Sequence, residues 1–368
     1  MSARRWHLFC RVVDNYGDAG VCWRMSRQLA REHGCDVTLW IDRIETLSRL
    51  EPGIDVNAKT QSIENVTIAR LFAADGVTML PDVVIEAFAC GLPERYIAAM
   101  AGSREPPLWI ALEYLSAEPW VDTVHGLASP QPRLPLERYF WFPGFTHHTG
   151  GLIREGGLLE ARTAFDANRP SNDALDIVLF SYPNRALTAL FDAWADGDEP
   201  IRCRIPEGVA TGALDRWLHG SVPHAGESTL RGRLRLDVIP FASQPAFDRM
   251  LWAADVNFVR GEDSFVRAQW AARAFVWTPY PQDENAHRLK LDAFLARYAA
   301  ELSARERVAV TGFWSAFNDE DGAASVAAWP AFRSIIDKLD AHGRRWATAL
   351  TGLPELTTGL VEFAERQL

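Results

Sequence analysis

The sequence predicts an α/β protein made of two doubly wound domains. At 368 residues the chain exceeds the length at which a single hydrophobic core keeps growing, so two domains are expected. β-prone apolar runs alternate with segments of helical periodicity in two separate series, which is the pattern of doubly wound sheets. Between the two series, residues 129–157 hold four prolines and five glycines and are expected to form a loop-rich linker.

The first series opens with a strand, a helix and a second strand, and in this helix Val21, Met25 and Leu29 recur at helical spacing. A later helix is opened by Pro93, a residue that suits the first helical turn. The expected strands are residues 6–13, 35–41, 82–88 and 108–114, and the expected helices are residues 19–32 and 93–100.

The second series repeats this alternation, and the tail over residues 324–368 has a helical pattern. Its expected strands are residues 175–182, 201–205, 234–241, 256–259 and 275–278, and its expected helices are residues 185–194, 212–218, 245–254 and 264–273. We therefore expect an N-terminal domain over residues 1–165 and a C-terminal domain over residues 166–349.

The charges and the cysteines indicate the setting of the protein. A formal net charge of -10 repels phosphate backbones, so we expect no direct nucleic-acid partner and no membrane surface, while a basic protein partner fits better. The five cysteines show no paired spacing and lie mostly in apolar runs, as reduced core thiols do. Arg11 interrupts the first apolar run too soon for a signal peptide or a membrane span. These features predict a cytoplasmic protein.

Polar clusters follow several of the predicted strands. Doubly wound sheets bind ligands outside the carboxyl ends of their strands, so these clusters are the candidate binding segments. They are DNYGDAG (residues 14–20), FASQPAFD (241–248), RGEDSFVRAQ (260–269) and YPQDEN (280–285).

The first cluster places two carboxylates, Asp14 and Asp18, where the first strand ends. A dinucleotide-binding turn is one interpretation, supported by Asp42 at the position of a ribose-binding acid, but the glycines lack the required pattern and the carboxylates would oppose a pyrophosphate. A second interpretation is turn chemistry, with Asp18 capping the following helix. Two carboxylates are better suited to a cation, which can be a guanidinium, an amine or a metal.

The clusters of the second domain suit a nucleotide diphosphate. Gly261 ends a strand and permits a close approach of the backbone, and the helix beginning around residues 262–264 offers free N–H groups and a positive dipole end. Phe241 and Phe247 flank Gln244, so the two rings can hold a flat base while the amide reads its edge. Core packing of both rings is the alternative interpretation.

Neither a metal site nor a hydrolase nucleophile is predicted. The two D-x-D matches lie in turn and acidic-loop sequence, and the adjacent His147 and His148 cannot share a helix face. No G-x-S-x-G sequence follows a predicted strand.

Four segments, DNYGDAGVCWR, LFSYPN, FASQPAFD and RGEDSFVRAQ, resemble in their order and spacing the bacterial elongation factor P arginine rhamnosyltransferases, which are GT-B enzymes. The resemblance spans nearly the whole chain, and the first and last of these segments are specific to the family. The family usually has Phe at the position of Tyr16 and often Ile at that of Ala19, and neither change removes a polar group that the chemistry needs. The resemblance implies two Rossmann-like domains that face each other across a cleft. With the double alternation, it also implies that the last helix, within residues 350–368, packs back onto the N-terminal domain.

The resemblance also implies an activity, the inverting transfer of L-rhamnose from dTDP-β-L-rhamnose to one arginine of elongation factor P, without a metal or another cofactor. Asp18 falls on the general base and Asp14 on its partner in holding the acceptor arginine, and Glu262 is a third candidate catalytic residue. The expected substrate-binding residues are Tyr16, Gly17, Phe180, Tyr182, Phe241, Gln244, Phe247, Arg260, Gly261, Asp263, Ser264 and Tyr280. On fold alone, another nucleotide-sugar transferase or epimerase, or a non-catalytic nucleotide-binding protein, remains an alternative.

Overall fold

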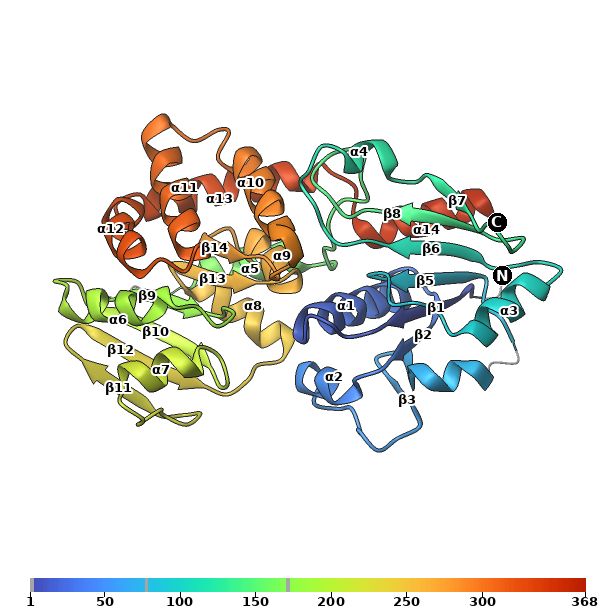
Figure 1. The fold of residues 1–368 in the computed structure, drawn as a ribbon, viewed down its shortest axis with the longest axis horizontal. Coiled ribbons are helices and arrows are strands. Elements are labelled where there is room, and N and C mark those ends of the chain that lie inside the picture. Colours follow the sequence, from blue (N-terminus) through green and yellow to red (C-terminus); the bar gives the residue numbers. More distant parts are fainter. Residues whose placement is uncertain (1–2, 77–78, 170–172) are drawn as a thin grey trace. The chain divides into compact units, whose positions relative to one another are not determined.

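The computed structural model of the chain describes residues 3–76, 79–169 and 173–368 (Figure 1). Contacts among these residues divide the chain into two compact units. Unit 1 runs up to Leu158 and takes in Leu350–Leu368, and unit 2 covers Leu159–Ala349. The chain therefore passes from one unit to the other twice.

Unit 1 is built on a mixed sheet that has, over its described residues, eight strands in the order β3-β4-β2-β1-β5-β6-β8-β7. β1 (Arg5–Cys10) pairs in parallel with both β2 (Asp36–Ile41) and β5 (Val83–Ala87). The remaining strands are β3 (Thr60–Ile63), β4 (Val66–Arg70), β6 (Leu108–Leu112), β7 (Ala128–Pro130) and β8 (Glu137–Trp141). β5 and β6 are buried at every position, as are strands covered on both faces.

The helices of unit 1 are α1 (Tyr16–Glu32), α2 (Ile44–Leu50), η1 (Leu71–Gly76), α3 (Glu94–Gly102), α4 (Val121–Val124) and α14 (Leu356–Gln367). α1 packs against β1 and β2. The ring of Phe363, in α14, lies 5.3 Å from that of Tyr139 and 5.2 Å from that of Trp141, both in β8. The last helix therefore contributes to the core of unit 1.

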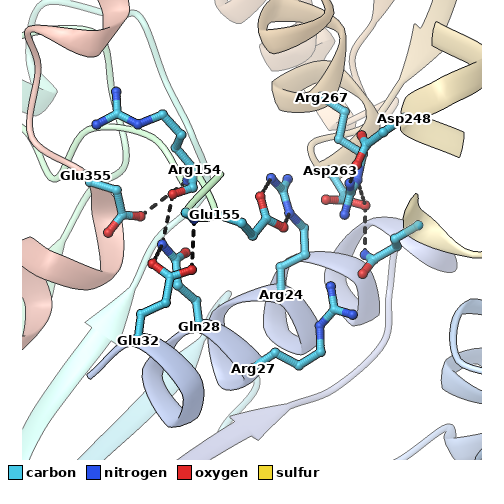
Figure 2. Close-up of polar contacts among 12 residues, drawn as sticks. Arg24, Arg27, Gln28, Glu32, Arg154, Glu155, Asp248, Asp263, Arg267 and Glu355 are labelled. Carbon is cyan, nitrogen blue, oxygen red and sulfur yellow. Dashed lines mark hydrogen bonds and ion pairs between the residues drawn. The ribbon is translucent and has the colours of Figure 1, made fainter. Parts of the chain in front are cut away.

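The last segment of unit 1 before the first passage is held by polar contacts (Figure 2). Arg24, a fully buried residue of α1, donates two hydrogen bonds to Glu155, from Nε at 2.6 Å and from Nη2 at 2.7 Å. Gln28, one turn further along α1, donates to the carbonyl oxygen of Arg154 at 2.9 Å. The backbone N–H of Arg154 donates to Glu355 at 3.3 Å. Both ends of unit 1 that lead to unit 2 are thus tied to each other and to α1.

The sheet of unit 2 has six strands in the described part of the chain, in the order β11-β12-β10-β9-β13-β14, and only β11 and β12 pair antiparallel. The strands are β9 (Leu175–Leu179), β10 (Ile201–Pro206), β11 (Ser228–Arg231), β12 (Leu234–Ile239), β13 (Val256–Arg260) and β14 (Ala274–Thr278). β9, at the centre of the sheet, is buried throughout.

Helices cover this sheet, with α6 against β12, α8 against β9, α9 against β13 and α11 against β14. The helices are α5 (Leu158–Asp166), α6 (Ala186–Asp196), α7 (Thr211–Trp217), α8 (Gln244–Ala253), α9 (Asp263–Ala271), η2 (Asp283–Asn285), α10 (Ala286–Tyr298), α11 (Ala304–Asn318), α12 (Gly322–Arg333) and α13 (Ile336–Thr351). Rings from β14, α10 and α11 pack together, with Phe275 5.2 Å from both Tyr298 and Trp314.

The predicted alternation is confirmed, because each expected strand and helix overlaps an observed one. Several predicted bounds are wrong in detail. The strands predicted over residues 108–114, 175–182 and 234–241 end earlier, at Leu112, Leu179 and Ile239. β1 ends at Cys10 and not at residue 13, because the residues after Cys10 alternate between exposed and buried as the chain leaves the sheet. α1 begins at Tyr16 and not at residue 19. The expected linker contains β7 and β8, and Pro130 is tolerated there because β7 is an edge strand.

Candidate active site

Both sheets reverse their strand order at one central strand. In unit 1, β1 lies between β2 and β5, and in unit 2, β9 lies between β10 and β13. Doubly wound proteins bind ligands outside the carboxyl ends of the strands at such a reversal. Asp14 and Asp18 follow β1, and the segment from Arg260 to Ser264 begins at the last residue of β13, so both predicted clusters lie at a reversal.

In unit 1, Asp18 organises the loop between β1 and α1. Its Oδ2 accepts the backbone N–H of Val13 at 2.7 Å and that of Asp14 at 2.8 Å. Asp42, at the end of β2, accepts the N–H of Val12 at 2.9 Å. These bonds hold Asn15 at φ 35°, a left-handed conformation that residues other than glycine rarely adopt. The carboxylates therefore determine the shape of the loop.

The start of α1 excludes the capping interpretation of Asp18. Asn15 is the N-cap, and Asp18 lies inside the first turn and reaches back to the preceding residues. A Cβ atom at Gly17 would lie 2.5 Å from Oδ2 of Asp14, so a larger residue there would displace this carboxylate. Glycine thus lets the Asp14 carboxylate fold over the start of the helix.

The two carboxylates are buried, with Asp14 7% exposed and Asp18 2% exposed. Burial raises the pKa of Asp18 above its ordinary value of 3.8, although hydrogen bonds from the backbone of Asp14 and Val13 and from the Tyr114 side chain oppose the rise. A buried carboxylate with a raised pKa has the proton affinity that suits a general base.

Tyr114 is a site residue that sequence reasoning missed. It follows β6 by two residues, and its ring stacks on that of Phe88 at a centroid distance of 4.5 Å. The predicted strand ran to residue 114 and so placed Tyr114 within the sheet, whereas β6 ends at Leu112 and leaves Tyr114 after a buried strand.

In unit 2, the turn between β13 and α9 is fixed by backbone and side-chain bonds. Gly261 has φ 60°, where glycine is favoured, and its N–H donates to the carbonyl of Thr278 at 3.0 Å. The Ser264 hydroxyl accepts the N–H of Arg260 at 3.0 Å and donates to the carbonyl of the same residue. The turn thus presents the N-terminus of α9, while the Ser264 hydroxyl is engaged in holding it.

Aromatic rings surround Arg260 at this edge of the sheet. Its guanidinium carbon lies 4.6 Å from the ring centroid of Phe180 and 4.7 Å from that of Tyr182, distances typical of cation–π contacts. Phe247 packs edge to face on Phe180 at 5.4 Å, and Tyr280, 40% exposed, packs the same way on Tyr182 at 5.8 Å. A cation, ring faces and a helix N-terminus therefore lie together.

Two predicted donor residues bond to each other. Gln244, the first residue of α8, is 3% exposed, and its Nε2 donates to Oδ2 of Asp263 at 3.1 Å. Glu262 is the half-buried N-cap of α9, and Phe241 is half-buried between β12 and α8. All the predicted residues of unit 2 therefore lie after β9, β12, β13 or β14.

A pocket of about 170 Å³ adjoins Arg260 and contains further residues that sequence reasoning missed. Its lining includes Ser181, Asn184 and Arg216, and Ser181 is buried. Ser181 and Asn184 belong to the LFSYPN segment. From this segment the sequence analysis predicted only the aromatic residues, Phe180 and Tyr182, as substrate-binding residues.

All five cysteines are free, as predicted, and only Cys35 is not fully buried. Among the residues described, no group of three or more His, Cys, Asp or Glu side chains is arranged to hold a metal ion. Across the same residues, no helix has the length and apolar character needed to span a membrane.

Comparison with known proteins gives matches over the full length. A family model described as the elongation factor P (EF-P) rhamnosyltransferase EarP matches residues 6–365. A protein-arginine rhamnosyltransferase of Pseudomonas putida is 45% identical over 376 residues, covering 99% of each chain. Another from Pseudomonas aeruginosa is 41% identical, covering 97% of this chain and 98% of the relative.

Solved structures agree with these matches. One described as the structural basis for EarP-mediated arginine glycosylation of translation elongation factor EF-P aligns with a TM-score of 0.69 at 34% identity, over 99% of this chain and 100% of that one. MurG of Acinetobacter baumannii aligns with a TM-score of 0.50 at 12% identity, over 99% and 100% of the two chains, a likeness that shows the fold alone. The fold class is GT-B, as predicted.

Proposed function

Because the chain belongs to the EarP family of elongation factor P rhamnosyltransferases, we propose that it transfers a rhamnosyl group to an arginine side chain of elongation factor P. The observation that carries the proposal is the span of the family match, residues 6–365, which includes both the loop of Asp14 and Asp18 and the turn from Arg260 to Ser264. A cationic acceptor also accounts for the two buried carboxylates of unit 1.

We assign the acceptor half of the site to unit 1. A guanidinium is protonated at working pH and its lone pairs are delocalised, so it becomes a nucleophile only as a base removes a proton. Asp18 takes that proton while the nitrogen–anomeric carbon bond forms, and Asp14 holds the guanidinium in place. The raised pKa of Asp18 favours this proton transfer.

We assign the donor, dTDP-β-L-rhamnose, to unit 2. The thymine is held by Phe247 and Phe180, with Phe241 as a second face, and Gln244 reads its edge. Arg260, the Tyr280 hydroxyl and the first-turn amides of α9 receive the diphosphate, and the Ser264 hydroxyl can add to them by turning away from Arg260. Glu262 and Asp263 contact the sugar.

The reaction is a single displacement in this proposal. The nitrogen–carbon bond forms on the face opposite the diphosphate as the carbon–oxygen bond to dTDP breaks, so the anomeric centre inverts. The charge that develops on dTDP is stabilised by protein groups, and we propose that no metal is required. Dialysis against EDTA is expected to leave the transfer rate unchanged.

The direct test is the intact mass of elongation factor P after incubation with the protein and dTDP-rhamnose. We expect a mass increase of one rhamnosyl group, lost when the acceptor arginine is replaced by lysine, and an α-configured product by NMR. UDP-sugars and dTDP-glucose should give neither the mass increase nor an equal thermal stabilisation. An unchanged mass with dTDP-rhamnose and transfer from another donor would return the alternative of a different nucleotide-sugar transferase.

The donor assignment predicts that Phe247→Ala and Gln244→Ala each weaken dTDP binding by about 1 kcal/mol or more, because each removes a contact with the base. Calorimetric titration with dTDP measures this. Leu230→Ala, at a position 71% exposed on β11, is the control and should bind as the wild type does. Wild-type affinity in both site variants would favour core packing as the role of these residues.

A further inference from the structure

A buried arginine connects the two helices that carry predicted donor residues. Arg267, in α9, is 2% exposed. Its Nη1 donates to Oδ2 of Asp248 at 2.7 Å, and its Nε donates to Oδ2 of Asp263 at 3.1 Å (Figure 2). Asp248 belongs to α8 and Asp263 begins α9, so one guanidinium bridges the two helices.

The same network reaches Gln244. Oδ2 of Asp263 accepts from Nε2 of Gln244 at 3.1 Å as well as from Arg267. Gln244 and Asp248 are four residues apart and lie on one face of α8. α8 is therefore held at two points of this face, at Asp248 directly and at Gln244 through Asp263.

Stability alone does not explain such a network. Removing charges from water costs about as much free energy as their attraction returns, so a buried ion pair adds little to folding when compared with apolar side chains. What the network determines is geometry, since the planar guanidinium fork sets the relative position of two carboxylates, and a lysine ammonium cannot reproduce that fork.

We propose that Arg267 is a positioning residue for donor binding. By holding Asp248 and Asp263, it sets the orientation of the Gln244 amide and of the first turn of α9. Arg267 acts through these residues and does not touch the donor itself. The proposal rests on the proposed function, because that function assigns the donor to Gln244 and α9.

Two variants test the proposal from opposite sides of the network. Arg267→Lys keeps the charge and loses the fork, and Asp248→Asn weakens the anchor on α8 while Arg267 can still contact Asp263. Calorimetric titration with dTDP should show roughly tenfold weaker binding in each, the size expected when neighbours in one hydrogen-bond network are perturbed. The KM for dTDP-rhamnose should rise by a similar factor, with kcat at saturating donor nearly unchanged.

Arg273→Lys is the matched control. Arg273 is also buried in unit 2, at 3% exposed, and bridges two carboxylates, those of Asp166 and Asp340. Its Nε also donates to the carbonyl oxygen of Trp252 at 3.0 Å, near the C-terminal end of α8. None of these contacts is with Gln244, Asp248 or Asp263, so its substitution should lower the melting temperature and leave dTDP affinity unchanged. A purely structural role of Arg267 predicts the same behaviour for both arginines.

The outcomes separate the two proposals. Weaker dTDP binding in Arg267→Lys and Asp248→Asn, but not in Arg273→Lys, supports the positioning role. Wild-type affinity in Arg267→Lys, or equal loss in Arg273→Lys, overturns it. If Arg267→Lys fails to fold, Asp248→Asn decides by the same measurement. A wild-type protein that binds no dTDP contradicts the donor assignment itself, and with it both proposals.

Discussion

At the scale of single residues, the structure separates the chemistry expected of Asp18 from its part in shaping the loop. Asp18→Asn keeps an oxygen that can accept the N–H groups of Val13 and Asp14 but cannot take a proton. Loss of a general base typically costs roughly 10²- to 10⁴-fold in rate, so single-turnover transfer should nearly disappear while dTDP-rhamnose affinity stays within a few-fold. Asp14→Asn should also impair transfer, through the placement of the acceptor.

Stability provides the control for this variant. The pKa of Asp18 is raised in the folded protein, so the protonated carboxyl favours the folded state. This stabilisation is fully present below the pKa of Asp18 in the unfolded chain and is lost as the pH rises through the folded-state pKa. At neutral pH the ionised carboxylate therefore lowers the free energy of unfolding. The neutral Asn variant should therefore melt at the same temperature as the wild type or higher. Asp82→Asn, which alters a carboxylate that accepts the N–H of Arg5 at the opposite end of β1, should retain activity. Near-normal turnover by folded Asp18→Asn protein would remove the base assignment.

Tyr114 predicts a shift in the pH dependence of transfer. Its hydrogen bond to Asp18 favours the ionised carboxylate and lowers the pKa, so Tyr114→Phe should raise the pKa of Asp18 further. Because the base must be ionised, the acid limb of the kcat/KM profile should move to higher pH, with little change on the plateau. Tyr139→Phe removes a hydroxyl that contacts Glu137 in the same sheet and should leave the limb in place. A limb that moves to lower pH, or equally in both variants, would contradict this assignment.

At the scale of elements, the contact between α1 and the segment ending unit 1 predicts a large effect on stability. Glu155→Ala leaves the fully buried Arg24 guanidinium without this carboxylate. Breaking a buried pair on one side typically costs about 3–5 kcal/mol. Because Glu155 is partly exposed, the expected loss is about 3 kcal/mol. Denaturant unfolding measures the loss. Glu362→Ala breaks an exposed pair with Arg366 on α14 and should cost roughly 0.5 kcal/mol or less.

The elements that the sequence predicted share a strong signal, whereas some of the missed elements lack such a signal and others carry one. β9 and β13 are buried apolar runs and were predicted, whereas β3 and β11 are short, mostly exposed edge strands. The turn between β3 and β4 uses Glu64 and Asn65 at φ 55° and 65°, without the glycine that usually marks such hairpins. α11 was also missed, although Ser303 and Glu306 form a capping box that the sequence contains.

In the candidate site, too, the sequence predicts some features and not others. Position after a predicted strand was enough to single out Asp14 and Asp18 in unit 1 and Arg260 in unit 2, because topology places such residues at the carboxyl edge of their own sheet. Which side chains bond to one another was not predictable. The contacts of Gln244 with Asp263 depend on how α8 packs on α9, and a sequence pattern carries no such information.

At the scale of the whole molecule, the C-terminal segment of the chain contributes to the hydrophobic core of unit 1. Phe363 of α14 is 8% exposed and packs on Tyr139 and Trp141, while the proposed donor residues belong to unit 2. Units with separate cores are expected to unfold in separable steps. A ligand bound by one unit stabilises that unit and shifts only its transition.

Phe363→Ala should therefore lower the unfolding transition of unit 1 alone, by about 3–5 kcal/mol for a core phenylalanine. Calorimetry with and without dTDP identifies the transitions, because only the one belonging to unit 2 should move with the nucleotide. Phe332→Ala is the reciprocal control, since Phe332 is fully buried in unit 2 and stacks on Phe313 at 4.8 Å, so it should lower the other transition. Titration with dTDP should give wild-type affinity for Phe363→Ala. One transition that falls in both variants and rises with dTDP would mean that the two cores unfold as a single cooperative system.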